Sequence, residues 1–185
     1  MNRAVVLAAL ALVLTVGGCS GTPSTMPPAP DRYGAPVPPR SLDATAQANQ
    51  PCGVLTEDQL RTFGLEPAGR LDPLPGGPPA CVWEGPGFTQ EVSVAVLPNR
   101  DFLVDTYRSR GMYQYFEPIT IAGLPATAQQ TTRGALTCTV TTGIALGQGL
   151  DVSATEYGAD PDPPCETARQ VSEAVAANLP EQLPK

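Results

Sequence analysis

The fold is decided by residues 136–155, which read LTCTVTTGIALGQGLDVSAT. Toward both ends of this stretch, apolar residues occupy every second position and polar residues fill the positions between them. Such alternation predicts two strands of an antiparallel sheet that has one apolar face and one face open to water. The glycine-containing segment 143–149 predicts the hairpin turn between them, and no Lys-Ser or Lys-Thr follows to make it a phosphate loop. The apolar positions are Leu136, Cys138, Val140, Leu150, Val152 and Ala154.

Shorter signals on both sides of this hairpin predict three helices and four more strands. Thr56 and Gln59 have the spacing of a capping box, Asn99 or Asp101 can cap a helix that carries Phe102, and Pro163-Pro164 suits the first turn of a last helix ending before Pro180. The additional strands are expected at residues 81–84, 91–96, 119–121 and 126–130. We therefore expect an α+β fold of order α-β-β-α-β-β-β-β-α, with the helices packed on one face of an antiparallel sheet.

The amino terminus has the layout of an export signal. Met1-Asn2-Arg3 is followed by an apolar run over residues 4–16 and then by Gly17-Gly18-Cys19. The run is shorter than the roughly 20 residues that span a bilayer, and small residues precede the expected cleavage point. We interpret residues 1–18 as a lipoprotein signal peptide, with Cys19 lipidated by a diacylglyceryl group. The alternative is an ordinary signal peptide with a chance cysteine.

Residues 19–51 are predicted to be the lipidated cysteine and a disordered tether. Eight prolines lie between residues 20 and 51, and apolar residues are too sparse to form a face. The tether either holds the domain away from the membrane or is a tail without a spacing role. A single domain is expected over residues 52–180, followed by a tail at 181–185.

The domain contains four cysteines, Cys52, Cys81, Cys138 and Cys165. In an exported chain an even number predicts two disulfides, for which three connectivities exist. We favour the sequential pairing, Cys52 with Cys81 and Cys138 with Cys165, because each bridge then joins a helix start to a strand. This pairing leaves no free thiol in the domain to act as a nucleophile.

Composition excludes several classes of function. The chain has 185 residues, 18 acidic against 11 basic, a net charge of −7 and no histidine. The absence of a basic stripe argues against a nucleic-acid-binding protein. The absence of histidine excludes Ser-His-Asp and Cys-His catalysis and histidine-bound zinc. We expect no cofactor, no metal and no catalytic residues.

An aromatic segment is the best candidate for binding. Tyrosine, methionine and arginine are typical of binding surfaces, and Arg108 and Arg110 lie within this segment. It can instead form the mouth of an apolar pocket, or pack down as the edge of the core. The candidate residues are Phe102, Tyr107, Met112, Tyr113, Tyr115 and Phe116.

For the other candidate site residues, a structural role is the simpler interpretation. A pair of carboxylates can cleave sugars without histidine, but the acids in question mostly fall on expected solvent-facing sides of strands. Asp160-Pro161-Asp162 offers oxygen ligands for calcium without the glycine turn of a calcium loop, so a helix cap is the simpler interpretation. Trp83 is expected to pack beside the disulfide of Cys81, with ligand stacking as the alternative. The carboxylates considered are Glu84, Glu91, Asp151 and Glu156.

Several short motifs occur together in one order along the chain. They are Gly-Gly-Cys19, the proline-rich stretch, Pro51-Cys52-Gly53-Val54-Leu55-Thr56, Cys81-Val82-Trp83, Gly123-Leu124-Pro125-Ala126, Cys138 in a late strand and Cys165 before the last helix. This arrangement resembles the actinobacterial envelope lipoproteins that share a domain of unknown function. The resemblance implies a lipid-anchored protein on the extracytoplasmic face of the cell membrane and an α+β domain. It implies no catalytic or ligand-binding residues.

The sequence therefore favours a non-enzymatic, membrane-anchored binding module for a protein or another envelope component. A carrier or sensor of a small hydrophobic ligand or lipid is the first alternative. A carboxylate-based cell-wall hydrolase is the second.

Overall fold

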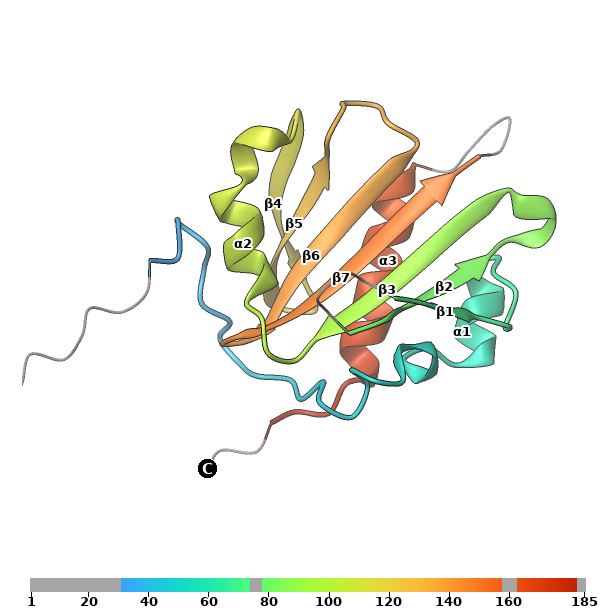
Figure 1. Ribbon diagram of the computed structural model, residues 1–185, viewed down its shortest axis with the longest axis horizontal. Helices are drawn as coiled ribbons and strands as arrows, with labels where there is room; N and C mark the ends of the chain where they lie inside the picture. Colours follow the sequence, from blue (N-terminus) through green and yellow to red (C-terminus); the bar gives the residue numbers. More distant parts are fainter. Residues whose placement is uncertain (1–30, 74–77, 158–162, 183–185) are drawn as a thin grey trace, which may run out of the picture. The chain divides into compact units, whose positions relative to one another are not determined.

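The computed structural model describes residues 31–73, 78–157 and 163–182, and its centre is a seven-stranded antiparallel sheet (Figure 1). The strand order is β1-β2-β3-β7-β6-β5-β4. The strands are β1 (Arg70–Asp72), β2 (Ala80–Glu84), β3 (Gln90–Leu97), β4 (Tyr115–Ile121), β5 (Leu124–Gln130), β6 (Thr137–Ala145) and β7 (Gln148–Glu156). The helices are α1 (Glu57–Thr62), α2 (Phe102–Arg108) and α3 (Pro164–Asn178), with short 3-10 turns η1 (Pro51–Gly53), η2 (Pro86–Phe88) and η3 (Arg110–Met112).

The hairpin of β6 and β7 lies at the centre of the sheet, as the alternating pattern predicts. Cys138 pairs with Ala154 and Val140 with Val152, so the apolar positions of the two strands share one face. The turn is tighter than expected, because the strands continue to Ala145 and resume at Gln148. Gly147, at φ 74°, takes the left-handed conformation that this two-residue connection needs.

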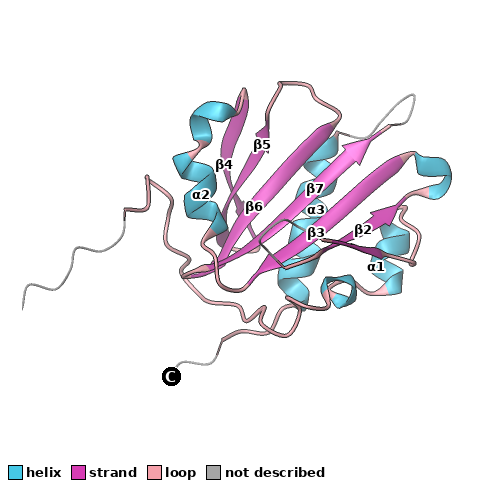
Figure 2. Ribbon diagram, viewed as in Figure 1, coloured by secondary structure: helices cyan, strands magenta, loops and turns pink. Residues whose placement is uncertain are grey.

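The apolar face of the sheet is covered by α3, which packs on β6 and β7 (Figure 2). Ala168, Val171 and Val175 of α3 are fully buried in the same cluster as Val140 and Val152. Thr56 and Gln59 form the predicted capping box of α1, whose Leu60 is buried in the same cluster. The antiparallel α+β class is therefore confirmed.

Both predicted disulfides are present. Cys52 in η1 is bonded to Cys81 in β2, and Cys138 in β6 is bonded to Cys165 in the first turn of α3. Trp83 is fully buried in the main core cluster together with Cys81. Both side chains approach the backbone at Gly69, where an added Cβ would lie 2.6 Å from the Cys81 sulfur and from Trp83 Nε1. Trp83 is thus a core residue beside the disulfide, as expected.

The expectation that all helices pack on one face is wrong, because α2 lies on the opposite, polar face. Gly143 and Gly149 are strand residues whose missing side chains make room for this helix. A Cβ on Gly149 would lie 2.8 Å from Cβ of Phe102, and one on Gly143 would lie 3.0 Å from Cδ2 of Leu103. A second small core forms there around Leu103, Tyr107 and Ala35. The sheet therefore has a helix on each side.

The element order also differs from the expected one. The short strand β1 was not anticipated, so the order is α-β-β-β-α-β-β-β-β-α. Strand β4 begins at Tyr115, earlier than residue 119, and runs through Pro118. A proline is compatible with this strand because β4 is an edge of the sheet and needs no ladder bond there.

The predicted disordered tether is wrong for residues 31–51, which run across the domain as an ordered strap. Leu42 and Ala44 are buried in the main core, and Ala35 is buried under α2. The Leu42 amide donates to the Ile144 carbonyl at 2.8 Å. A few well-placed apolar residues and backbone hydrogen bonds suffice to fix a segment whose average composition is that of a linker. Residues 19–30 of the expected tether lie outside the described residues, as does the signal peptide.

The expected C-terminal tail begins inside the domain as well. Glu181 forms an isolated antiparallel bridge with Leu42, and the Gln182 amide donates to the Ser41 carbonyl at 2.8 Å. The Asp43 amide donates to the Pro180 carbonyl at 2.8 Å. The strap and the segment after α3 thus hold each other in place.

Candidate functional site

A pocket of about 520 Å³ lies between α2 and the polar face of the sheet. Gln129 of β5, Thr139 of β6 and Asp151 of β7 line its floor. Phe102 and Tyr113 line it from the side of α2 and the segment that follows. Its volume falls within the range of small-molecule sites. The pocket exists because α2 covers only part of the polar face and leaves the adjoining part open.

The floor is a continuous chain of side-chain hydrogen bonds across three strands. Thr127 Oγ1 donates to Gln129 Oε1 at 2.8 Å, and Gln129 Nε2 donates to Thr141 Oγ1 at 2.7 Å. Thr141 Oγ1 then donates to Asp151 Oδ1 at 2.6 Å. All but Asp151 are buried, so the chain ends at a carboxylate that reaches the pocket.

Hydroxyl pairs extend the polar floor along β6 and β7. Thr139 Oγ1 and Ser153 Oγ lie 2.7 Å apart, and Thr137 Oγ1 and Thr155 Oγ1 lie 2.9 Å apart. Each pair is a direct cross-strand neighbour in the ladder. A hydroxyl has one donor and two acceptor positions, so each pair retains bonding capacity after its mutual bond is made. This surface can accept and donate hydrogen bonds but carries no charge.

Asp151 is the titratable group of the floor. Removal of its carboxyl from bulk water raises the pKa of Asp151 to about 6, and the hydrogen bond from Thr141 only partly opposes this. The side chain keeps part of its surface accessible and lines the pocket. Its protonation state therefore changes around pH 6.

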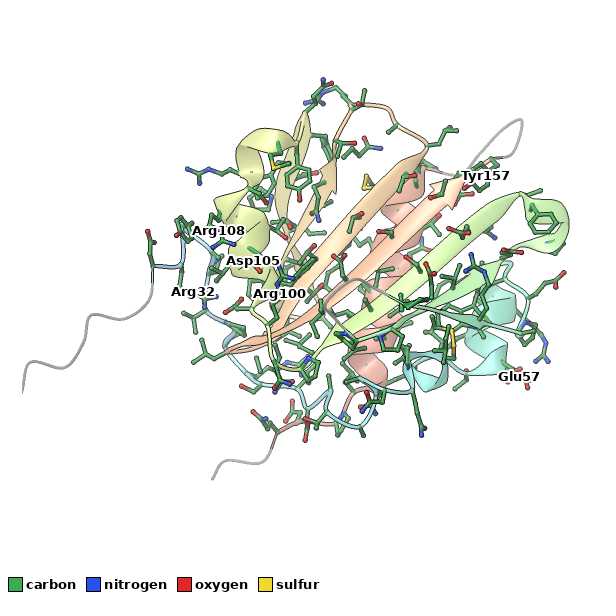
Figure 3. All side chains as sticks on the ribbon, viewed as in Figure 1. Arg32, Glu57, Arg100, Asp105, Arg108 and Tyr157 are labelled. Atoms are coloured by element: carbon green, nitrogen blue, oxygen red, sulfur yellow. A yellow bond between two sulfur atoms is a disulfide. The ribbon has the colours of Figure 1, made fainter. Side chains whose placement is uncertain are left out.

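Three charged side chains form the lip of the pocket (Figure 3). Arg100 Nε lies 2.6 Å from Asp105 Oδ2, and Arg108 Nη2 lies 2.7 Å from Asp105 Oδ1. The Arg100 guanidinium also lies 5.0 Å from the centre of the Phe102 ring. Two guanidiniums share one carboxylate, so the lip carries a net charge of +1.

The predicted aromatic patch is divided between the two faces of the sheet. Tyr107 is buried and meets Phe116 edge to face at 5.3 Å between ring centres, and Tyr113 stacks on Phe116 at 6.2 Å. Tyr115 points to the opposite face, where it packs against the main core and its hydroxyl donates to Glu117. That hydrogen bond, with burial, raises the pKa of Tyr115. Met112 alone of the set is strongly exposed, at 76%.

The six residues therefore do not form one surface. Tyr107 and Phe116 belong to the small core under α2, while Phe102 and Tyr113 line the pocket. Tyr115 and Phe116 lie in β4, ahead of the strand expected at residues 119–121. Two members of the predicted set thus reach the candidate site, by way of α2 and its following segment.

The four carboxylates considered for catalysis are also dispersed. Glu84 and Glu91 are cross-strand partners at the β2–β3 edge, and Arg70 lies 3.8 Å and 3.5 Å from them. Glu156 is buried and accepts a hydrogen bond from Thr167 of α3 at 2.9 Å. Only Asp151 reaches the pocket.

The second carboxylate of the pocket, Asp105, was not anticipated. The one available sequence signal is the spacing of Arg100, Asp105 and Arg108, which places opposite charges near each other around a helix. Asp160-Pro161-Asp162, the possible calcium segment, lies outside the described residues. Within the residues that the structure describes, no cluster of three or more metal-ligating side chains occurs. The described helices include none with the length and apolarity needed to cross a membrane.

Replacing Asp151 with asparagine is expected to stabilise the unliganded protein at pH 7.5 by about 2–3 kcal/mol. The carboxyl has a higher pKa in the folded protein than in the unfolded chain, so ionisation opposes folding. The cost starts as pH rises above about 3.8 and is complete above about 6. Urea unfolding of Asp151→Asn and the parent at pH 4 and pH 7.5 measures it. The gain should vanish at pH 4, and Asp72→Asn, at a half-exposed carboxylate, should show no such pH dependence.

Comparison with known proteins identifies a family without a described activity. Residues 14–178 match the family described as "Protein of unknown function (DUF3558)". No curated protein and no solved structure gives a significant match.

Proposed function

Since the chain belongs to the DUF3558 family, whose description assigns no activity, we propose its function from its geometry: it is a lipid-anchored, extracytoplasmic binding module that holds a small polar envelope component in the pocket beneath α2. The observation that carries this proposal is the polar floor, which ends in Asp151 at the base of a pocket of about 520 Å³. Convergent polar groups within a concave pocket are the usual mark of a ligand site.

The pocket supports a polar ligand in preference to the hydrophobic ligand or lipid of the carrier hypothesis. Its floor consists of hydroxyl, amide and carboxyl groups, and its lip carries three charged side chains. A hydrocarbon chain would leave these groups without water and without partners, at a cost of about 1–3 kcal/mol for each unsatisfied group. The apolar core on the other face is filled by side chains from α3 and the sheet.

The proposed location rests on the amino-terminal signal. A lipid on Cys19 would hold the protein at the outer face of the cell membrane, because each buried acyl CH₂ contributes about 0.8 kcal/mol. The ordered strap starts near Arg32, whose guanidinium is bonded to Asp101. Twelve residues from Cys19 to Asp31 span at most about 40 Å. The start of the strap would therefore stay within about 40 Å of the lipid attachment point.

Replacing Cys19 with alanine is expected to move the protein from the membrane fraction to the soluble fraction. The change removes the thiol to which the diacylglyceryl group would be attached. Detergent phase partitioning of the expressed full-length chain measures the effect, and Cys19→Ala should leave the detergent phase. Unchanged partitioning would contradict lipid anchoring.

Native mass spectrometry of the anchored protein, purified in a mild detergent from an exporting host, tests the binding function. We expect a small-molecule adduct that denaturation releases. Ala135→Trp places a large side chain at the rim of the pocket and should abolish the adduct. Ala177→Trp, on the exposed side of α3, is the matched control and should retain it. An adduct that survives Ala135→Trp would locate binding elsewhere.

If the purified protein carries no adduct, a second measurement tests the binding function. Thermal shift with a panel of polar and apolar small molecules should then reveal stabilisation of the parent and of Ala177→Trp, but not of Ala135→Trp. If no compound gives this pattern and no adduct is found, the proposed binding function is wrong.

The hydrolase alternative retains one supporting observation, the raised pKa of Asp151, which is a property of general acids. The other carboxylate in the pocket, Asp105, is shared by Arg100 and Arg108, which disfavours its use as a base or nucleophile. Release of reducing ends from cell-wall polymer at pH 5–6, lost in Asp151→Asn, would favour a hydrolase over the binding module.

A further inference from the structure

Asp151 has an incomplete set of hydrogen bonds. Among the residues described, the carboxylate receives one side-chain donor, Thr141 Oγ1, on Oδ1. A carboxylate offers about four acceptor positions, and those in partly buried sites are normally used. Because Asp151 lines the pocket and is partly accessible there, its second oxygen, Oδ2, is available to a ligand.

The chain of hydrogen bonds leading to Asp151 can run in two directions. In one direction Thr127 donates to Gln129, Gln129 to Thr141, and Thr141 to an ionised Asp151. The second direction satisfies more groups, because in the first one Gln129 Oε1 faces the backbone carbonyl oxygens of Thr127 and Thr139 at 2.9 Å and 3.2 Å. With the amide turned over, its nitrogen donates to these carbonyls and to Thr127 Oγ1 at 2.8 Å, and its oxygen accepts from Thr141 Oγ1 at 2.7 Å. Thr141 has a single proton, so its 2.6 Å contact with Asp151 then requires a proton on Asp151.

In both directions Asp151 Oδ2 is a hydrogen-bond acceptor on the side of the pocket. When Asp151 is ionised, Oδ2 is an acceptor. When the proton sits on Oδ1 and is given to Thr141, Oδ2 is a carbonyl oxygen and is still an acceptor. A ligand that binds Asp151 must therefore bring a hydrogen-bond donor in either state.

The charges around the pocket favour an uncharged donor. The lip, formed by Arg100, Asp105 and Arg108, carries a net +1, which offsets the charge of an ionised Asp151 and leaves the pocket without a net negative charge to attract an ammonium group. A carboxylate or phosphate would bring only acceptors to Asp151 Oδ2. On the sheet side, the floor beside Asp151 consists of the uncharged side chains of Gln129, Thr139 and Thr141, and its β3 partner is Ala95. Hydroxyl and amide N–H groups remain.

The rest of the pocket selects among uncharged donors. Thr139 and Thr137 also line the pocket, where each is paired with a hydroxyl of β7, Ser153 or Thr155, and can both donate and accept. The Phe102 and Tyr113 rings line the pocket and provide flat apolar surfaces. A sugar ring has vicinal hydroxyls at its edge and C–H groups on its face, so it matches both features.

We propose that the pocket beneath α2 binds an uncharged saccharide, one hydroxyl of which donates to Asp151 Oδ2. This inference rests on the proposed binding function and names its ligand class. Because the donated bond is stronger to an ionised than to a neutral carboxyl, binding releases a proton from Asp151. The affinity rises as pH increases through about 6.

Isothermal titration calorimetry of the purified full-length protein tests the proposal. The probes are chitotriose, maltotriose and mannotriose, with the fully deacetylated chitotriose as the ammonium-bearing analogue and trigalacturonate as the carboxylate-bearing one. We expect at least one neutral trisaccharide to bind, about tenfold more tightly at pH 7.5 than at pH 5, and both charged analogues to fail. At pH 6, titrations in buffers of different ionisation enthalpy should report net proton release.

Three variants separate the contributions. Asp151→Asn imitates the protonated state, so it should weaken binding about tenfold at pH 7.5 and abolish both proton release and pH dependence. Asp151→Leu removes the acceptor and should lower the affinity at least 100-fold. Glu84→Gln, at the β2–β3 edge, is the control and should behave like the parent.

The outcomes separate a wrong ligand class from a wrong binding function. Binding of a charged analogue, proton uptake, or an undiminished pH dependence in Asp151→Asn would overturn the saccharide assignment. A different small molecule that Ala135→Trp excludes would also overturn it while leaving the binding function intact. If nothing binds in a manner that Ala135→Trp prevents, both fail.

Discussion

Removing the Cys138–Cys165 disulfide by a Cys138→Ala, Cys165→Ala double replacement is expected to lower the free energy of unfolding by about 3.5 kcal/mol. The bridge spans 27 residues between β6 and the first turn of α3. It holds the start of α3, the helix that covers the apolar face, onto β6. Without it, the unfolded chain gains the entropy of an open loop.

The Cys52–Cys81 bridge, which spans 29 residues, should contribute a similar amount. A domain of ordinary stability has about 5–15 kcal/mol in total. Loss of both bridges should therefore bring the protein close to unfolding at 37 °C, and either single removal should leave it folded. Guanidinium unfolding of the parent, the two double replacements and the fourfold replacement measures this. If the free energy of unfolding of the fourfold variant were within 1 kcal/mol of that of the parent, the disulfides would not stabilise the domain as expected.

The features that were predictable from sequence are those in which a local pattern and its packing agree. The alternation in residues 136–155 places Cys138, Val140 and Val152 on one face, and a one-residue slip in register would turn them to the other face. The capping box at Thr56 and Gln59 is complete within four residues. The disulfides follow because each cysteine lies at an element boundary or in a strand that such signals already locate.

The position of α2 was not predictable by the same reasoning. A strand face of threonine, serine and aspartate is compatible with water and equally with a helix that covers it partly. The available signal was the pair of glycines, Gly143 and Gly149, interpreted as parts of a turn. They lie opposite each other in β6 and β7, where α2 approaches the sheet.

The candidate site was only partly predictable for a related reason. Asp151 was considered as one of a pair of carboxylates, yet it meets a threonine and an open pocket. The burial and the neighbours of Asp151 depend on α2, which is distant from Asp151 in the sequence. In the sequence, only its spacing from Arg100 and Arg108 distinguishes Asp105 from other helix residues. Its place at the lip of the pocket depends on its ion pairs with these two residues, which only the structure shows.

The stabilising effect expected of Asp151→Asn connects stability with the proposed function. Ionisation of the Asp151 carboxyl opposes folding, whereas in the proposed complex a ligand hydroxyl would complete its hydrogen bonds. The same residue should therefore raise the stability of the unliganded protein when neutralised and lower the affinity for the ligand.

The strap connects the amino terminus with this site. Ala35 packs against Leu103 and Tyr107, and Arg32 Nη1 lies 2.7 Å from Oδ2 of Asp101, the residue that caps α2. The strap thus holds the helix that forms one wall of the pocket. Loosening the strap should weaken ligand binding even though no strap residue lines the pocket beneath α2.

Replacing Leu42 with alanine is expected to lower the free energy of unfolding by about 3 kcal/mol. Leu42 is 1% exposed in the main core, and its amide is bonded to Ile144 at the end of β6. Val37→Ala is the matched control, because Val37 lies in the same strap and is 57% exposed. It should change stability by less than about 0.5 kcal/mol. Urea unfolding of both variants measures the difference.

If residues 31–51 were a free tether, neither replacement would change the free energy of unfolding. Equal free energies of unfolding for the two variants and the parent would therefore show that the strap does not contribute to the fold.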